Sequence, residues 1–379
     1  MPGNLLLYAQ HLLGIGHLVR AAGISRALAE RGFAVTFVSG GVPVPGLETG
    51  AARFVQLPPV RAGDESFTSL IDQRGRRIDD AWRRRRRQRL LDIYRGVAPD
   101  ILVLETYPFG RRQMAFELDP LLDAARGDKA PPIIATSIRD VVIPSSRPER
   151  VEQAIAKARR YLDLVLVHGD PRLIRLTESF PRAAALGDLL RYTGYVVTPA
   201  TAPPGEEGRE EILVSAGGGA VGARLLSLAI AARPRTDACD APWRVLVGHN
   251  LPDDRFRAMR REAPPGVTVA RARRDFQAML ARCRLSISQG GYNTILEALA
   301  AGARTVCVPF AGAGEIEQTL RCRRLAERGL VEVVEEDAAT PESLAAAVNR
   351  ALSAPSATCA IDMEGAWRTA SLLAECPRP

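Results

Sequence analysis

The feature that most constrains the fold is a repeated alternation of short apolar runs with segments of helical periodicity. In the first half of the chain the apolar runs predict buried strands at 5–8, 34–38, 101–104, 133–136 and 164–167. Helical patterns lie between them, at 19–31, about 78–95, 116–126 and 150–162. Such alternation favours an α/β architecture, in which helices cover both faces of a parallel sheet.

The second half repeats this pattern after a segment rich in proline, glycine and charge, Thr198–Glu211, which is typical of a linker. Strands are predicted at 212–215, 243–247, 285–288 and 305–309, and helices at 223–233, 276–281, 294–301, 317–328 and 341–353. We therefore expect an N-terminal Rossmann-like domain at 1–197, a linker at 198–211 and a second domain at 212–354. The remaining segment, 355–379, is expected to form a helix that packs back on the first domain. Two such halves would face a cleft, where ligands often bind.

The excess positive charge lies in the first half. Residues 1–198 hold 29 basic and 21 acidic side chains, and the remainder holds 22 of each. Its densest cluster is Arg83–Arg87, for which two interpretations stay open. One is a solvated helix, and the other is contact with an anionic acceptor or with anionic lipid headgroups. Nucleic acid is not an expected partner, because aromatic residues make up only 5% and no recognition module is evident.

The cysteines and the N-terminus bear on the compartment. None of the six cysteines forms a C-x-x-C pair, and Met1–Gln10 lacks the basic start of a signal peptide. No stretch approaches the roughly 18 apolar residues that span a bilayer. We expect a cytoplasmic protein with reduced thiols, and a peripheral association with the inner face of the membrane is left open.

The most specific motif is Ser288-Gln289-Gly290-Gly291-Tyr292-Asn293-Thr294. A predicted strand ends at its serine and a helix begins near Thr294, so backbone N–H groups at the helix start can bind phosphate. Glu297 then lies near the first turn, where its carboxylate can accept hydrogen bonds from ribose hydroxyls. Glu317 and Gln318 begin the following helix after a glycine-containing loop, and suit sugar hydroxyls.

Two weaker motifs also join a strand to a helix. The run Ser215–Gly222 contains Gly217, Gly218 and Gly219, which would also suit a phosphate. The run Gly14–Arg20 contains Gly16 and His17, and this histidine is expected at the carboxyl edge of the first sheet, where it can act as a base.

Two acidic residues end strands at the edge where His17 is expected. Glu105 ends the strand at 101–104 and would orient His17, while Asp140 is a lesser candidate. A structural role is expected for His11.

These residues resemble those of GT-B glycosyltransferases, and most closely the MurG-like group. The likeness covers nearly the whole chain, from GIGHLVRAAGISRALAERGF to SQGGYNTILEALAAGARTVCVPF and EQTLRCRRLAERG. It implies two Rossmann-like domains, with Gly217–Gly219 and Gly290–Asn293 at the diphosphate, Glu297 at the ribose, and Glu317 and Gln318 at the donor sugar. It assigns the base to His17 and its acidic partner to Glu105. Arg20 departs from the group, which has proline there.

The resulting hypothesis is an inverting, metal-independent transferase that uses a nucleotide-diphosphate sugar, expected to be UDP-linked, as co-substrate. No Asp-x-Asp metal motif occurs in the sequence, and no cofactor is expected. The acceptor is not named by the sequence, and an anionic or lipid-linked one is the hypothesis. Two rivals stay open: a UDP-sugar hydrolase like the MurG-like hydrolase of pseudaminic acid biosynthesis, and a non-enzymatic nucleotide-sugar sensor or basic scaffold.

Overall fold

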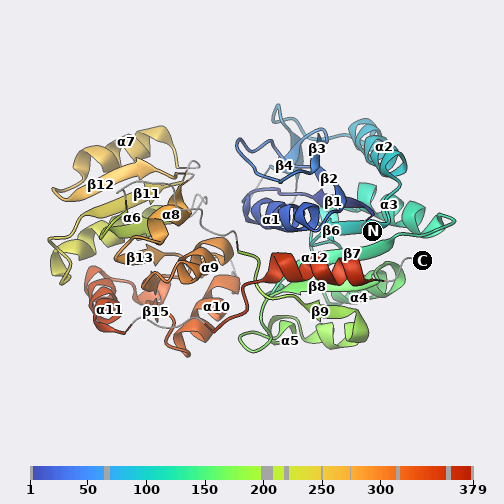
Figure 1. Ribbon diagram of the computed structural model, residues 1–379. Helices are drawn as coiled ribbons and strands as arrows, with labels where there is room; N and C mark the ends of the chain where they lie inside the picture. Colours follow the sequence, from blue (N-terminus) through green and yellow to red (C-terminus); the bar gives the residue numbers. More distant parts are fainter. Residues whose placement is uncertain are drawn as a thin grey trace. The chain divides into compact units, whose positions relative to one another are not determined.

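The computed structural model describes residues 3–63, 69–197, 208–216, 222–248, 251–273, 275–312, 316–355 and 360–376. The chain forms two compact units (Figure 1): Met1–Val196 together with Asp362–Pro379, and Val197–Ile361. Each unit is a parallel sheet between helices, which confirms the predicted fold class. Within the predicted linker at 198–211, residues 198–207 lie outside the described part of the chain.

The first unit is built on a sheet that contains, among the described residues, seven parallel strands in the order β3-β2-β1-β6-β7-β8-β9. These strands are β1 (Asn4–Ala9), β2 (Ala34–Ser39), β3 (Arg53–Gln56), β6 (Ile101–Glu105), β7 (Ile133–Arg139), β8 (Leu164–His168) and β9 (Leu190–Tyr192). A separate antiparallel pair joins β4 (Val60–Ala62) to β5 (Leu70–Asp72).

The helices of this unit divide between the two faces of the sheet, because alternate residues of β1 point to opposite sides. Leu6 and Tyr8 pack with residues of α2 (Asp80–Val97), α3 (Ala115–Gly127) and α4 (Pro148–Tyr161). Leu5 and Leu7 pack with α1 (Gly16–Glu30) and with α12 (Gly365–Glu375). A short helix, α5 (Leu176–Ser179), precedes β9.

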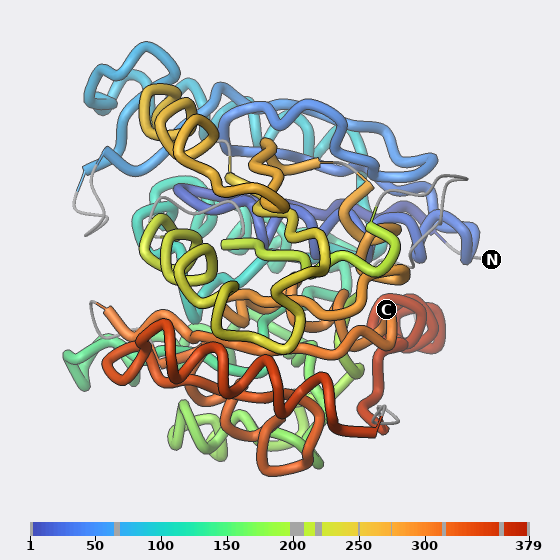
Figure 2. Tube along the Cα trace, turned by 90° about the vertical axis from the view of Figure 1, so that its left-hand side faces the viewer, coloured from blue at the N-terminus to red at the C-terminus, as the bar shows by residue number. Residues whose placement is uncertain are grey.

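The C-terminal helix α12 is part of the first unit. It lies beside α1 (red beside blue in Figures 1 and 2), and it buries Ala370 and Leu373 in the same core as Leu18. Backbone bonds join its leading segment to the end of the N-terminal stretch, from Tyr195 N to Asp362 O (2.7 Å) and from Gly365 N to Tyr195 O (2.9 Å). The chain therefore leaves this unit and returns to complete it.

The second unit has, within its described residues, a six-stranded parallel sheet in the order β12-β11-β10-β13-β14-β15. Its strands are β10 (Ile212–Ser215), β11 (Trp243–Val247), β12 (Val267–Arg271), β13 (Leu285–Ser288), β14 (Thr305–Cys307) and β15 (Glu332–Val333). Its helices are α6 (Ala223–Ala232), α7 (Asp253–Glu262), α8 (Phe276–Leu280), α9 (Tyr292–Ala300), α10 (Glu317–Ala326) and α11 (Pro341–Ser353).

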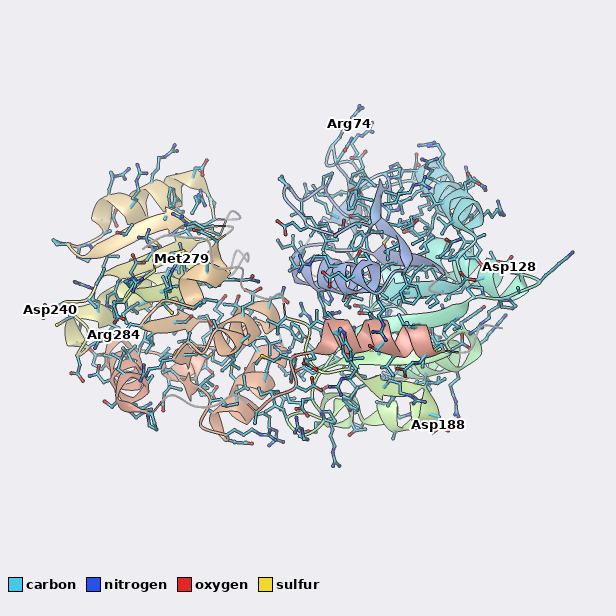
Figure 3. All side chains as sticks on the ribbon, in the orientation of Figure 1. Arg74, Asp128, Asp188, Asp240, Met279 and Arg284 are labelled. Atoms are coloured by element: carbon cyan, nitrogen blue, oxygen red, sulfur yellow. The ribbon has the colours of Figure 1, made fainter. Side chains whose placement is uncertain are left out.

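Helices cover both faces of this second sheet as well. Ile212 and Val214 of β10 pack with residues of α6 and α11. Leu213 faces the other way and packs with Met279 of α8, labelled in Figure 3, and with Ala298 of α9. The strand pattern read from the sequence was correct in the sheet centres and incomplete at the edges, where β3, β9, β12 and β15 were not predicted.

Candidate functional site

Several of the predicted site residues lie where the strand order of their sheet reverses, among them His17, Glu105 and Gln289–Asn293. The first strand of each unit, β1 or β10, has an earlier crossover on one side, to β2 or β11, and a later one on the other, to β6 or β13. In doubly wound sheets ligands bind at the carboxyl ends of the strands at this reversal. His17 follows β1 and Glu105 ends β6, while Gln289–Asn293 follow β13.

In the first unit, His17 and Glu105 are in direct contact. The Nδ1 atom of His17 lies 2.6 Å from Glu105 Oε1, and Thr106 Oγ1 donates to the same oxygen at 2.6 Å. Glu105 is buried, whereas the side chain of His17 keeps 22% of its exposure. The Glu105 carboxylate holds the imidazole at its Nδ1 side and leaves part of the ring at the surface. Gly16 starts α1, one residue before His17, at a helix end with no side-chain cap.

Arg20 was noted in the sequence as a departure, and in the structure it completes this cluster. It lies three residues after His17 on α1, which puts both side chains on one face of the helix. Its Nη2 atom donates to Glu105 Oε1 at 2.7 Å and to Oε2 at 3.0 Å, and its side chain is buried. The three-residue spacing from His17 was the signal in the sequence for this role of Arg20. It points to this role only once Glu105 is known to lie beside the same face of the helix.

The protonation states follow from this geometry. Arg20 and the hydrogen bonds to Glu105 hold the pKa of that carboxyl well below its usual range, despite its burial. An ionised carboxylate only accepts, so His17 donates from Nδ1 and its Nε2 is the basic atom. Burial, followed by the charge of Arg139, lowers the pKa of His17 to about 3. His17 is therefore a neutral imidazole at physiological pH, the form that can take a proton.

Two other sequence candidates belong to the interior. Asp140 is fully buried and accepts a hydrogen bond from Tyr195 Oη at 3.0 Å, so it supports the fold. His11 is buried with its ring against Gly41, which agrees with the structural role predicted for it. His168, which the sequence did not single out, lies buried between the hydroxyls of Ser137 and Thr193, each at 2.8 Å.

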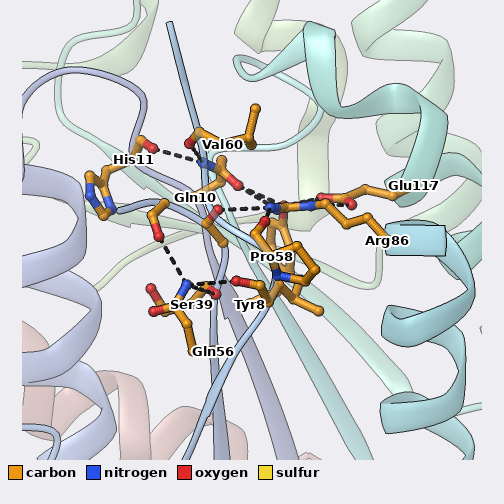
Figure 4. Close-up of polar contacts among 12 residues, drawn as sticks. Tyr8, Gln10, His11, Ser39, Gln56, Pro58, Val60, Arg86 and Glu117 are labelled. Atoms are coloured by element: carbon orange, nitrogen blue, oxygen red, sulfur yellow. Dashed lines mark hydrogen bonds and ion pairs between the residues drawn. The ribbon is translucent and has the colours of Figure 1, made fainter. Parts of the chain in front are cut away.

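The arginine run on α2 includes one residue that is not at the surface. Arg86 is fully buried and forms an ion pair with Glu117 at 2.7 Å. It also donates to Gly40 O at 2.8 Å, to Pro58 O and to Gln10 Oε1 at 2.7 Å (Figure 4).

This position corrects the expectation that Arg83–Arg87 act together at a surface. Arg86 ties the ends of β1, β2 and β3 together, and a surface contact is left to exposed residues such as Arg84 and Arg85. Arg74, at the turn after β5, also extends outward (Figure 3).

In the second unit, the glycine turn adopts the shape that its sequence predicts. Gly290 has φ 72°, in the left-handed region that favours glycine, and a Cβ there would overlap Cys322 Sγ. Gly291 caps α9, whose first turn contains Asn293 and Thr294, with no side-chain hydrogen bond at that cap. In the part of the chain that the structure describes, no atom beyond the two neighbouring residues lies within 4 Å of a Cβ built on Gly291, so a ligand can approach the backbone there. Gln289, just before the turn, is buried.

Glu297 lies one turn further along α9. Its Oε1 accepts a hydrogen bond from Gln277 Nε2 of α8 at 3.0 Å, a partner that the sequence did not indicate. Burial raises the pKa of Glu297 to about 7, and the bond from Gln277 opposes that shift only in part.

Glu317 and Gln318 occupy the first turn of α10. The carboxylate of Glu317 accepts from Arg321 at 2.9 Å, and Gln318 Oε1 accepts from Phe310 N at 3.2 Å. The glycines predicted to bind phosphate after β10, Gly217, Gly218 and Gly219, lie outside the described residues. Within the described residues, no group of three or more His, Cys, Asp or Glu side chains could hold a metal ion.

Comparisons with known proteins agree with this fold. Residues 213–368 match the model of the glycosyltransferase family 28 C-terminal domain. A UDP-N-acetylglucosamine–N-acetylmuramyl-(pentapeptide) pyrophosphoryl-undecaprenol N-acetylglucosamine transferase of Syntrophotalea carbinolica is 30% identical over 153 residues, 38% of this chain and 41% of that protein. The chain thus spans about two fifths of the length of this curated relative.

Solved structures match over almost the whole chain. MurG of Acinetobacter baumannii superposes with a TM-score of 0.62 at 16% identity, covering 99% of this chain and 100% of that one. The spinosyn rhamnosyltransferase SpnG complexed with thymidine diphosphate gives 0.57 at 16% identity, covering 98% and 94%. At 16% identity these superpositions show a shared fold.

The fold is that of a GT-B protein, with two Rossmann-like units that each carry candidate site residues at the strand reversal. Within that class the chain is MurG-like, and residues 213–368, most of them in the second unit, match the glycosyltransferase family 28 C-terminal domain. The resemblance drawn from the sequence motifs is thereby confirmed. No helix in the described part of the chain is long and apolar enough to cross a bilayer.

Proposed function

We propose that the protein is an inverting, metal-independent glycosyltransferase that moves a sugar from a nucleotide-diphosphate sugar, expected to be UDP-linked, to an acceptor hydroxyl. The observation that carries the proposal is the pairing of His17 with Glu105 at the strand reversal of the first unit. The second unit, with its family 28 domain, supplies the donor-binding turn at Gly290–Asn293. No further cofactor enters the proposal.

In the proposed reaction, Nε2 of His17 takes the proton of the acceptor hydroxyl. The oxygen attacks the anomeric carbon from the face opposite the leaving group, and the bond between that carbon and the diphosphate breaks. Backbone N–H groups at the start of α9 stabilise the negative charge on the departing diphosphate. Glu105 holds the imidazole in the tautomer that accepts at Nε2, and it stabilises the imidazolium that forms.

The nucleobase of the donor and the identity of the acceptor rest on the relatives that the chain resembles. The relative from Syntrophotalea carbinolica is named for a UDP-linked donor and a lipid-linked acceptor, whereas the spinosyn enzyme binds thymidine diphosphate. We propose UDP first, with an acceptor that is anionic or lipid-linked. A cytoplasmic location with peripheral membrane contact through the exposed arginines of α2 fits such an acceptor.

The first test is a thermal-shift panel of UDP, TDP and their sugars, including UDP-N-acetylglucosamine, because a ligand that binds the folded state raises its apparent stability. We expect one nucleotide series to stabilise the protein. The stabilising donor is then incubated with protein and a pooled set of lipid-linked and anionic acceptors. His17→Ala should lower turnover about 10²–10⁴-fold, the range of general base catalysis, and leave the donor-induced shift unchanged.

Two results would contradict the proposal. The first is the absence of a shift with every nucleotide. The second is rapid stoichiometric release of free sugar without any acceptor, since that behaviour belongs to a hydrolase.

A further inference from the structure

The first turns of α10 contain a buried cation that no part of the proposed reaction uses. The side chain of Arg321 is 0% exposed, and its Nη2 atom donates to Glu317 Oε1 at 2.9 Å. Glu317 lies one helical turn earlier and keeps 13% of its side-chain exposure. The pair therefore joins an interior guanidinium to a carboxylate that still reaches the surface of the second unit.

A buried guanidinium is costly unless an anion and other polar partners compensate it. An apolar side chain of similar volume would fill the same space without that cost. The planar, always charged guanidinium offers a fixed orientation for the carboxylate that it binds. The buried charge therefore indicates that holding the Glu317 carboxylate in one place is the task of Arg321.

The same guanidinium also contacts the other donor segment. It lies 5.0 Å from the ring centroid of Tyr292, the buried residue that follows the Gly290–Gly291 turn. The next residue of α10, Cys322, packs its sulfur beneath Gly290. Two consecutive residues of α10 thus support the glycine turn, and one of them also holds Glu317. The segment for the diphosphate and the segment for the sugar are linked through Arg321.

We propose that Arg321 is a positioning residue that sets the selectivity for the donor sugar. It presents the Glu317 carboxylate, which can only accept hydrogen bonds, to a hydroxyl of the sugar. It also fixes the position of that carboxylate relative to the Gly290–Gly291 turn. This inference rests on the proposed function. It assigns the effect of Arg321 to the sugar part of the donor and not to the nucleoside diphosphate part.

The test is a double-mutant cycle read by calorimetry with UDP-N-acetylglucosamine and with UDP, or with the sugar nucleotide and diphosphate that the panel favours. Arg321→Met should weaken binding of the sugar nucleotide about tenfold, as expected for a lost hydrogen bond to a charged group, and change that of the diphosphate less than about twofold. Arg321→Lys should restore part of the affinity. In the Glu317→Gln background, Arg321→Met should cause no further loss, because the two residues act as one unit.

The matched control is Arg323→Met on the same helix, whose side chain is 60% exposed and pairs with Glu335. It should leave both affinities unchanged. If Arg321→Met alone does not fold, Arg321→Lys and the Glu317→Gln/Arg321→Met double variant, which removes both charges, complete the comparison. An equal loss of diphosphate affinity, an unreduced effect in the Glu317→Gln background, or unchanged sugar affinity would overturn the inference. Wild-type protein that binds neither probe would overturn the proposed function itself.

Discussion

At the scale of single residues, the charge state of each functional group is set by its neighbours. Glu105 and Glu297 are both carboxylates in largely buried positions, yet their pKa values move in opposite directions. Glu105 has Arg20 beside it, so it stays ionised and orients His17. At Glu297 the neutral amide of Gln277 opposes the effect of burial only in part, and the pKa rises to about 7. The first is a permanent anion, whereas the second titrates near physiological pH.

Donor binding should therefore depend on pH through Glu297. Ribose hydroxyls bind best to the ionised carboxylate, so the nucleotide affinity should rise about tenfold between pH 6 and 8 and then level off. Binding at pH 7 should release about half a proton per molecule, because Glu297 is half protonated there, and calorimetry in buffers of different ionisation enthalpy measures this release directly. Glu297→Gln should bind more weakly at pH 8 and lose this pH dependence. A wild-type affinity that stays constant from pH 6 to 8 would contradict the assignment.

At the scale of secondary-structure elements, the turn between β13 and α9 places two adjacent glycines under different constraints. Gly290 has a positive φ and lies against Cys322, while Gly291 has φ −58° and open space at the Cβ position. The first glycine is required by the backbone and by packing. The second leaves room for a ligand.

The two glycines should respond differently to alanine. Gly290→Ala should lower the free energy of unfolding by about 2–4 kcal/mol, because it combines backbone strain with overlap against the core. Gly291→Ala should leave that free energy within about 0.5 kcal/mol of wild type and weaken diphosphate binding. Denaturant unfolding and calorimetry on both variants give the comparison. Equal destabilisation by the two substitutions would show that the turn is not constrained in this way.

At the scale of the whole molecule, the first unit contains three histidines that are neutral in the fold, two of them buried and one, His17, partly buried. Burial lowers the pKa of His11, and it lowers the pKa values of His17 and His168 to about 3. In the unfolded chain each has an ordinary pKa near 6.5. Below pH 6.5 the unfolded chain binds protons that the folded chain does not, so stability must fall with pH in this range.

Stability should accordingly be highest above pH 6.5 and decline toward pH 4, by up to about 1.4 kcal/mol per pH unit for each such histidine. Urea unfolding at a series of pH values measures the slope. His168→Asn, which removes a titrating group away from the proposed base, should reduce that slope between pH 6.5 and 4. An unchanged slope in this variant would mean that His168 is not a neutral buried group.

Sequence reasoning was most successful where local pattern decides structure. The alternation of strands and helices follows from apolar periodicity, and the glycine turn follows from its local motif. The contact of His17 with Glu105 follows because the carboxyl ends of parallel strands meet at one sheet edge. It failed where local pattern is weak. Strands β3 and β12 are edge strands with partly exposed residues, and helix α7 has no buried residue, so their apolar periodicity is faint.

What the sequence by itself determined is the architecture and the identity of the candidate residues, because periodicity and strand-end position are properties of neighbouring residues. What only the tertiary structure decided is which charges meet. Arg86 is one of five consecutive arginines, and its burial against Glu117 depends on the packing of α2 on α3. Arg20, Gln277 and Arg321 likewise gain their roles from partners on other segments or at a buried helix face, since the environment of a charge is set by what folding brings around it.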